Sequence, residues 1–376
     1  MKKDLGKILN LVVIVGTLIA VIVIGLTSKD LSGAVKSLSG VGLGWVLLCV
    51  VGCACNVATD ALALWYFLRR QGCHVHFLYM MFVSVSGLYY SNITPGATGG
   101  QPMQVYYLAK KGVPMGLATS ALVVRFFSFQ FMLSVVAAIA WIRYPVFIEK
   151  SVGEYKWFMV LGFCYNTVMV AGIVLLVFKR EWIRKGVRAL VKLGHRVHLV
   201  KDPEKTLARA DVTVDTFVDS ISMFKERKLD LVVQLVIGAV QLLCQMTILY
   251  FIYLSLGLRT ATWGQVVAVD IMEYVSAAYM PLPGASGASE VTFSLYFSHL
   301  FQDEGLCFAA LMLWRFFTYY FMLLVGMVVT MAYGWRAGEG AKAVLKQNEQ
   351  RKAEWEASLA EEARKHRDED DDDEDE

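Results

Sequence analysis

The chain is built from long apolar runs separated by short polar stretches. Six of these runs reach the length of about 20 residues that an α-helix needs to cross a hydrocarbon core. We therefore predict an all-α polytopic membrane protein with about six full transmembrane helices. The first run is too long for the apolar core of a secretory signal, so we expect a retained helix. The runs cover residues 8–26, 45–68, 117–140, 157–178, 229–256 and 306–333.

Two further apolar segments, at residues 78–109 and 264–301, are each interrupted by a loop that contains Pro-Gly-Ala. The first loop reads Thr94-Pro-Gly-Ala-Thr-Gly-Gly-Gln101, and the second reads Leu282-Pro-Gly-Ala-Ser-Gly-Ala-Ser289. After the first break, residues 101–109 would form about 14 Å of helix, which is too short to span a membrane. We predict two re-entrant hairpins that dip into the membrane and return to the side they left.

A repeated motif follows each hairpin. The sequence from Arg125 is Arg-Phe-Phe-Ser-Phe-Gln-Phe-Met-Leu, and the sequence from Arg315 is Arg-Phe-Phe-Thr-Tyr-Tyr-Phe-Met-Leu, identical at six of nine positions. Three predicted crossings separate the two hairpins, and an odd number places them on opposite sides of the membrane. We therefore predict an inverted-topology repeat, as in many transporters, with halves at about 78–140 and 264–333.

Composition and charge agree with this pattern and add an orientation. The chain is 56% hydrophobic and 18% charged, which is typical of a membrane protein. If the N-terminus is cytoplasmic, 28 of the 36 Lys and Arg residues lie inside and six outside. The remaining two, Arg125 and Arg315, lie within the membrane. The positive-inside rule thus predicts a multi-pass protein of the cell (plasma) membrane with both termini in the cytoplasm.

Charge also divides the chain. We expect a membrane domain at residues 1–335 that includes a basic cytoplasmic connector at 179–228. The connector either lies on the inner leaflet, where each Lys or Arg gains about 1 kcal/mol from anionic lipid, or is an ordinary positive loop. Residues 336–376 form a charged cytoplasmic tail, and its nine consecutive acids at 368–376 predict disorder.

The intramembrane arginines are the leading candidates for function. A charged side chain at the bilayer centre costs at least about 2.5 kcal/mol and usually marks a substrate path or an ion pair. One interpretation is that each arginine locks helices together by pairing with a buried acid. The other is that Arg125 and Arg315 receive a phosphate from each side in turn, since a guanidinium fork suits phosphate oxygens. Duplication on both sides favours the second. The candidate acids are Asp60, Asp270, Glu273 and Glu290.

The loops supply the other candidate contacts. Backbone amides and half-helix N-termini at membrane depth favour an anion, and glycine and proline hinges permit the tight turn. Close helix packing is an alternative reason for the glycines. The acids, Asp60, Asp270 and Glu273 above all, suit a positively charged headgroup. The hinge candidates are Pro95, Gly96, Gly99, Gly100, Pro283, Gly284 and Gly287. The hydroxyl and amide candidates are Thr94, Thr98, Gln101, Ser286 and Ser289.

Other chemistries find little support. The seven cysteines lie in or beside apolar spans and indicate neither a disulfide framework nor a metal site. The histidines lack ligand spacing, and no serine or cysteine belongs to a credible triad. We therefore expect no metal, no cofactor and no catalytic residues.

The two loops and the Arg315 helix resemble the lysyl-phosphatidylglycerol synthase transmembrane family, the MprF-like flippase domain. The likeness covers residues 1 to about 335. It implies a flippase that moves aminoacylated phosphatidylglycerol, such as lysyl-phosphatidylglycerol, from the inner to the outer leaflet. Because residues 336–376 do not supply the soluble synthase domain, we expect translocation without synthesis, and so no enzyme activity.

The resemblance also implies partners: a phospholipid substrate, the lipid bilayer, a separate aminoacyl-lipid synthase and a homo-oligomer, a dimer in the family. No nucleic acid is expected. Two alternatives stay open. One is a membrane enzyme or transporter that acts on another anionic or isoprenoid-linked lipid. The other is a non-transporting adaptor that binds partners through its acidic tail.

Overall fold

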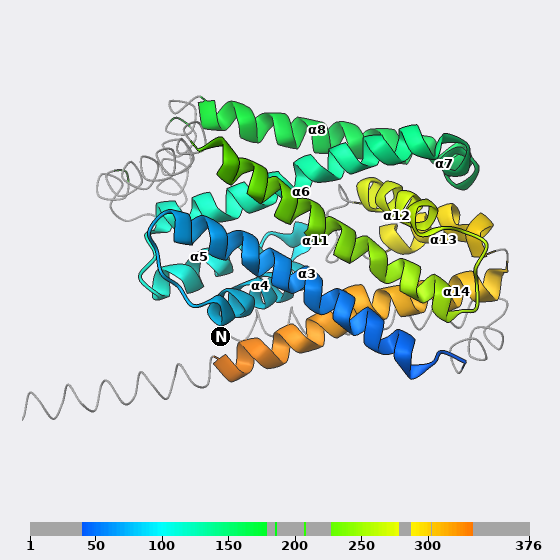
Figure 1. Ribbon diagram of the computed structural model, residues 1–376, viewed down its shortest axis with the longest axis horizontal. Coiled ribbons are helices and arrows are strands. Elements are labelled where there is room, and N and C mark those ends of the chain that lie inside the picture. Colours follow the sequence, from blue (N-terminus) through cyan, green and yellow to red (C-terminus); the bar gives the residue numbers. More distant parts are fainter. Residues whose placement is uncertain are drawn as a thin grey trace, which may run out of the picture. The chain divides into compact units, whose positions relative to one another are not determined.

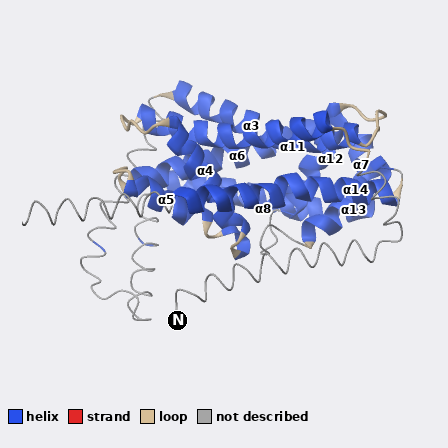
Figure 2. Cartoon of the chain, turned by 90° about the horizontal axis from the view of Figure 1, so that it is seen from below, coloured by secondary structure: helices blue, strands red, loops and turns tan. Residues whose placement is uncertain are grey.

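The computed structural model describes residues 40–178, 227–277, 287–301 and 303–333, together with Lys185 and Leu207. The described residues form helices and loops and contain no β-strand, which confirms the all-α prediction (Figure 2). The first apolar run, nearly all of the basic connector and the tail from residue 336 lie outside the described residues. The chain divides into two compact units, residues 1–326 and 327–376. Both hairpins and both arginines belong to the first unit.

Five helices in the described part of the chain are long and apolar enough to cross a bilayer, so this is an all-α polytopic membrane protein. They match five of the six predicted runs. The helix expected at residues 157–178 is α8, which begins at Lys156, and the span extends back to Pro145 because a short helix precedes it, with proline in the first helical position, where its missing amide hydrogen is not needed. The five are α3 (Leu43–Arg70), α6 (Met115–Arg143), Pro145–Val174, α11 (Lys228–Ser255) and Glu304–Tyr333.

Two of these five contain shorter elements. The span from Pro145 comprises α7 (Pro145–Val152), the 3-10 turn η2 (Gly153–Tyr155) and most of α8 (Lys156–Phe178). The span from Glu304 comprises α14 (Glu304–Arg315) and the π-helix η4 (Phe316–Phe321), after which the helix continues.

Each predicted hairpin contains a pair of packed helices. In the first, α4 (Phe77–Asn92) and α5 (Gly100–Lys110) flank the 3-10 turn η1 (Pro95–Ala97). In the second, α12 (Trp263–Ala277) and α13 (Ala288–Phe301) flank residues 278–286, which are outside the described residues. The two pairs lie toward opposite ends of the first unit (Figure 1, Figure 2). Among the described residues, three long helices separate the two pairs along the chain, and an odd number of crossings leads to this placement.

Helix α11 packs along both α3 and α6 and fixes the helices that carry the predicted charges (Figure 1). On the α3 side, Gln234 Nε2 donates to the Ala63 carbonyl at 3.0 Å. On the α6 side, a Cβ atom added at Gly238 would lie 3.0 Å from backbone atoms of Ser128. Small residues let helix backbones approach closely in a membrane, where interhelical packing replaces the hydrophobic effect.

Candidate functional site

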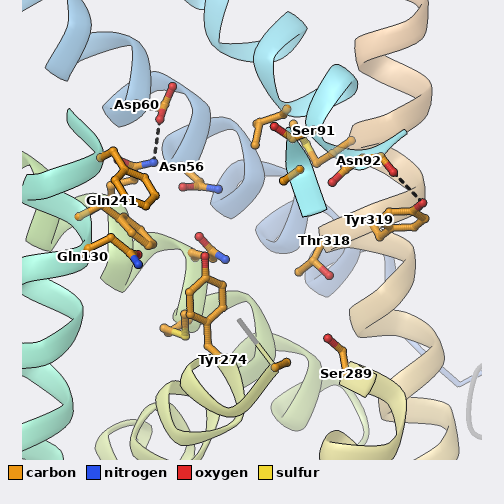
Figure 3. A pocket seen from close by; sticks show the side chains of 18 of the residues that line it. Asn56, Asp60, Ser91, Asn92, Gln130, Gln241, Tyr274, Ser289, Thr318 and Tyr319 are labelled. Carbon is orange, nitrogen blue, oxygen red and sulfur yellow. Dashed lines mark hydrogen bonds between the residues drawn. The ribbon is translucent and has the colours of Figure 1, made fainter. Parts of the chain in front are cut away.

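A cavity of about 880 Å³ lies inside the first unit, between the two hairpins. We call it the central cavity. Both predicted repeat halves contribute to its wall, and Figure 3 shows its polar side chains around a common space. Nine of the residues predicted from the sequence line it: Asp60, Gly96, Thr98, Gln101, Arg125, Asp270, Glu273, Ser289 and Arg315.

Arg125 reaches the cavity from α6, ten residues after the helix begins at Met115, or about 15 Å along its axis. Its Nη1 contacts Asp60 Oδ1 on α3. Its Nη2 lies 3.5 Å from Gln104 Oε1 on α5, and its buried Nε has no hydrogen-bond partner in the described part of the chain. The Arg125 side chain keeps 17% of its surface exposed. The Nε of this guanidinium is therefore buried and unpaired within the part of the chain that the structure describes.

Arg315 lies at the end of α14, eleven residues after Glu304, and its guanidinium is held differently. Its Nε and Nη2 lie 2.8 Å from Glu290 Oε1 and Oε2, respectively. Glu290 Oε2 also accepts from the Gly287 amide at 2.5 Å, which ties the start of α13 to the pair. The two side chains are 5% and 8% exposed. The Glu290 carboxylate thus contacts the Arg315 guanidinium at two points, and the pair is largely closed to solvent.

The two interpretations of the arginines are compatible with this geometry. Each arginine pairs with a buried acid, as the locking interpretation predicts, and the partners are Asp60 and Glu290. Each also lines the central cavity, as a role in binding requires. A lock alone does not explain why both arginines line the same cavity.

The remaining acids, Asp270 and Glu273, lie on α12 and line the cavity while being 3% and 1% exposed. Residues three apart share a helix face, which explains why both point the same way. Glu273 Oε1 accepts from the Thr292 hydroxyl at 2.8 Å, linking α12 to α13. Among the described residues, no group of three or more His, Cys, Asp or Glu side chains is placed to hold a metal ion.

Several cavity residues were not predicted. Asn56 on α3 and Gln241 on α11 both line the cavity, and Gln241 Nε2 donates to Asp60 Oδ1 at 3.0 Å. The signal was present in the sequence: Asn56 precedes Asp60 by four residues, and Gln241 precedes Gln245 by four, within otherwise apolar spans. Polar residues at helical spacing in a membrane helix face the bundle interior. The other unpredicted polar lining residues include Ser91, Asn92, Gln130, Tyr274, Thr318 and Tyr319.

Three residues of the first loop have a structural role that the geometry explains. Gly96 has φ 60°, a left-handed conformation that glycine adopts readily. Thr94 is not part of the cavity wall, because its hydroxyl accepts from the Gly99 amide at 2.9 Å and donates to the Tyr90 carbonyl at 2.7 Å. At Gly100, an added Cβ would lie 2.6 Å from the Gly87 carbonyl oxygen.

Loop glycines therefore serve both the turn and close helix packing, the two reasons predicted for them. In the second loop, Gly287 has φ 85°. Pro283, Gly284 and Ser286 lie outside the described residues. Pro95 begins the η1 turn.

Comparison with known proteins covers most of the chain. The family model described as "Lysylphosphatidylglycerol synthase TM region" matches residues 11–326. A protein of Pyrococcus horikoshii named as a UPF0104 membrane protein is 22% identical over 334 residues, which cover 85% of this chain and 96% of that protein.

Proposed function

This chain belongs to the family of the lysylphosphatidylglycerol synthase transmembrane region, and from that premise we propose that it is a lipid flippase. Its substrate would be an aminoacylated phosphatidylglycerol, such as lysyl-phosphatidylglycerol, moved from the inner to the outer leaflet. One observation is the main support for the proposal. Two arginines, each on the helix that follows a hairpin, face the same cavity from repeat halves whose hairpins lie at opposite ends of the first unit.

The physical barrier to lipid translocation is the charged headgroup, because the apolar bilayer centre cannot solvate it. Fixed charges in the cavity lower this barrier while the acyl chains remain in the lipid. The phosphate binds first at Arg125, whose Nε has no hydrogen-bond partner among the described residues. Arg–phosphate hydrogen bonds are charge-assisted and directional, which suits this role. The carboxylates of Asp60, Asp270 and Glu273 accommodate the ammonium groups of the aminoacyl part.

In this proposal the protein moves the lipid and does not make it. A separate synthase supplies the aminoacylated lipid on the cytoplasmic side. The free energy for net movement comes from the lipid gradient, the membrane potential or protons.

Reconstitution in liposomes with labelled lysyl-phosphatidylglycerol tests the proposal. Arg125→Ala and Arg315→Ala should each slow flipping about tenfold or more, since a hydrogen bond to a charged group contributes roughly 1.5–3 kcal/mol. Arg70→Ala is the matched control. Arg70 also pairs with an acid, Asp230, at 3.0 Å, but neither residue is part of the cavity wall.

Flipping by Arg125→Ala and Arg315→Ala at the rate of Arg70→Ala would remove the arginines from the mechanism. No lipid movement by the unaltered protein would reject the flippase proposal itself.

A further inference from the structure

Three buried side-chain oxygens of residues that line the central cavity have no hydrogen-bond donor among the described residues: Asn56 Oδ1, Asp60 Oδ2 and Gln241 Oε1. Asp60 and Gln241 are 3% and 8% exposed. A buried acceptor without a donor loses its hydration and gains nothing in return, so native proteins rarely keep several of them together. All three atoms are acceptors, and none is a donor.

The three side chains form one cluster. Asn56 and Asp60 are four residues apart on α3 and therefore share a face. Gln241 on α11 is joined to them by its Nε2, which donates to Asp60 Oδ1 at 3.0 Å. Asp60 Oδ1 also contacts Arg125, so the cluster adjoins the guanidinium whose Nε is unengaged. Figure 3 shows Asn56, Asp60 and Gln241 on the same side of the cavity.

The chain contains an internal comparison for this cluster. Gln234, seven residues before Gln241 on α11, also donates through Nε2 and has an Oε1 for which the described residues supply no donor. Gln234 does not line the cavity, whereas Gln241 does. An unpartnered oxygen alone is thus no sign of a ligand. The distinguishing feature of the cluster is that its three acceptors belong to side chains that line a cavity beside a cation.

We propose that Asn56, Asp60 and Gln241 form a subsite for the hydrogen-bond donors of a lipid headgroup, ammonium or hydroxyl groups, whose phosphate lies at the Nε edge of Arg125. A phosphate diester offers only acceptors, so it cannot satisfy these oxygens, and its charge would be repelled by the Asp60 carboxylate. The inference rests on the proposed function, which supplies the lipid substrate. Its new content is the part of the headgroup that these three residues bind.

Native mass spectrometry of the full chain in detergent tests this with three lipids that share a phosphate diester. Lysyl-phosphatidylglycerol offers ammonium donors, phosphatidylglycerol offers hydroxyl donors, and phosphatidylmethanol offers no headgroup donor. We expect at least one donor lipid to bind about tenfold more tightly than phosphatidylmethanol, equivalent to about 1.4 kcal/mol. Preference for the first lipid identifies an ammonium subsite, and equal preference for the first two identifies a hydroxyl subsite.

Gln241→Met should reduce this preference at least threefold, and Gln234→Met should leave it unchanged. Asn56→Leu, on the other helix, is a second variant in case Gln241→Met does not fold, as judged by its thermal unfolding. Equal binding of all three lipids by the unaltered protein would overturn the subsite. So would an equal loss of preference in Gln241→Met and Gln234→Met.

Because binding in detergent requires no transport, the two proposals can fail separately. Selective binding without lipid movement in liposomes keeps the subsite and rejects the flippase. Movement of lysyl-phosphatidylglycerol without any preference over phosphatidylmethanol keeps the flippase and rejects the subsite.

Discussion

Two arginines that begin the same sequence motif are held in different ways, and burial explains what each ion pair contributes. Arg315 meets Glu290 at two points, and its side chain is 5% exposed, whereas Arg125 meets Asp60 at one point and is 17% exposed. An ion pair removed from water cannot lose one partner without leaving an uncompensated charge. An ion pair open to solvent can lose one partner at little cost, because water replaces the missing partner.

Neutralising the acid of each ion pair should therefore destabilise the protein in order of arginine burial. Glu290→Gln should lower Tm most, with a cost of about 3–5 kcal/mol because Arg315 stays buried and uncompensated. Asp60→Asn should have a smaller effect. Asp230→Asn should have the smallest, since its partner Arg70 is 44% exposed. Thermal unfolding of the purified variants in one detergent measures the order. Equal shifts in Tm would show that burial does not set the strength of these pairs.

The sequence identifies these charged residues more readily than their pairing. Arg125 and Asp60 stand out as isolated charges in apolar runs, but they are 65 residues apart, and Asp270 or Glu273 would be equally reasonable partners. Which acid lies near which arginine depends on how α3 and α6 cross. Neutral amides such as Asn56 and Gln241 are harder to notice, because one amide changes the hydropathy of a long run very little.

At the scale of elements, close helix contacts position the cavity wall. Helix α8 approaches α12 at Gly162, where an added Cβ would lie 2.0 Å from the Val275 carbonyl oxygen. Helix α12 also carries Asp270 and Glu273, which line the cavity. Any side chain at position 162 must therefore displace either α8 or α12, and α12 forms part of the wall of the central cavity.

We predict that Gly162→Ala destabilises the protein by about 1–3 kcal/mol, the usual cost of overpacking, and slows lipid flipping by shifting α12. Gly172→Ala is the matched control, because Gly172 lies on the same helix with no atom within 4 Å of an added Cβ. Alanine favours a helix over glycine, so this control should be neutral or slightly stabilising. Thermal unfolding and liposome flipping give the two readouts, and identical results for both variants would contradict the packing argument.

Hydropathy predicts the spans and the broken hairpins well, because membrane helices have a length fixed by the bilayer and prolines and glycines interrupt them. It does not predict backbone detail. The motif after Arg125 continues as a regular α-helix, whereas the similar motif after Arg315 forms the π-helix Phe316–Phe321. Short π-helical segments often occur at functional sites, and their position depends on tertiary neighbours that the motif alone does not specify.

At the scale of the whole molecule, the first unit joins one half whose arginine has a buried Nε without a partner among the described residues to another whose arginine contacts Glu290 at two points. Both face one cavity, and their hairpins lie at opposite ends of the unit (Figure 1). This arrangement has the geometry for a site reached from one side at a time, provided that the hairpins enter the membrane from opposite sides. That condition concerns topology and can be measured without a transport assay.

Single cysteines at the bases of the hairpins measure from which side of the membrane each hairpin enters. In a chain whose seven native cysteines are replaced, Arg69→Cys and Lys111→Cys flank the first hairpin, and Arg259→Cys precedes the second; all three positions are exposed. A re-entrant hairpin returns to its own side, so positions 69 and 111 should react with a membrane-impermeant maleimide from the same side of sealed vesicles. Three crossings then separate position 111 from position 259, so position 259 should react only from the opposite side. If the first hairpin instead crossed the membrane, positions 69 and 111 would react from different sides. If all three positions reacted from one side, the hairpins would share an entry side and the inverted repeat would be wrong.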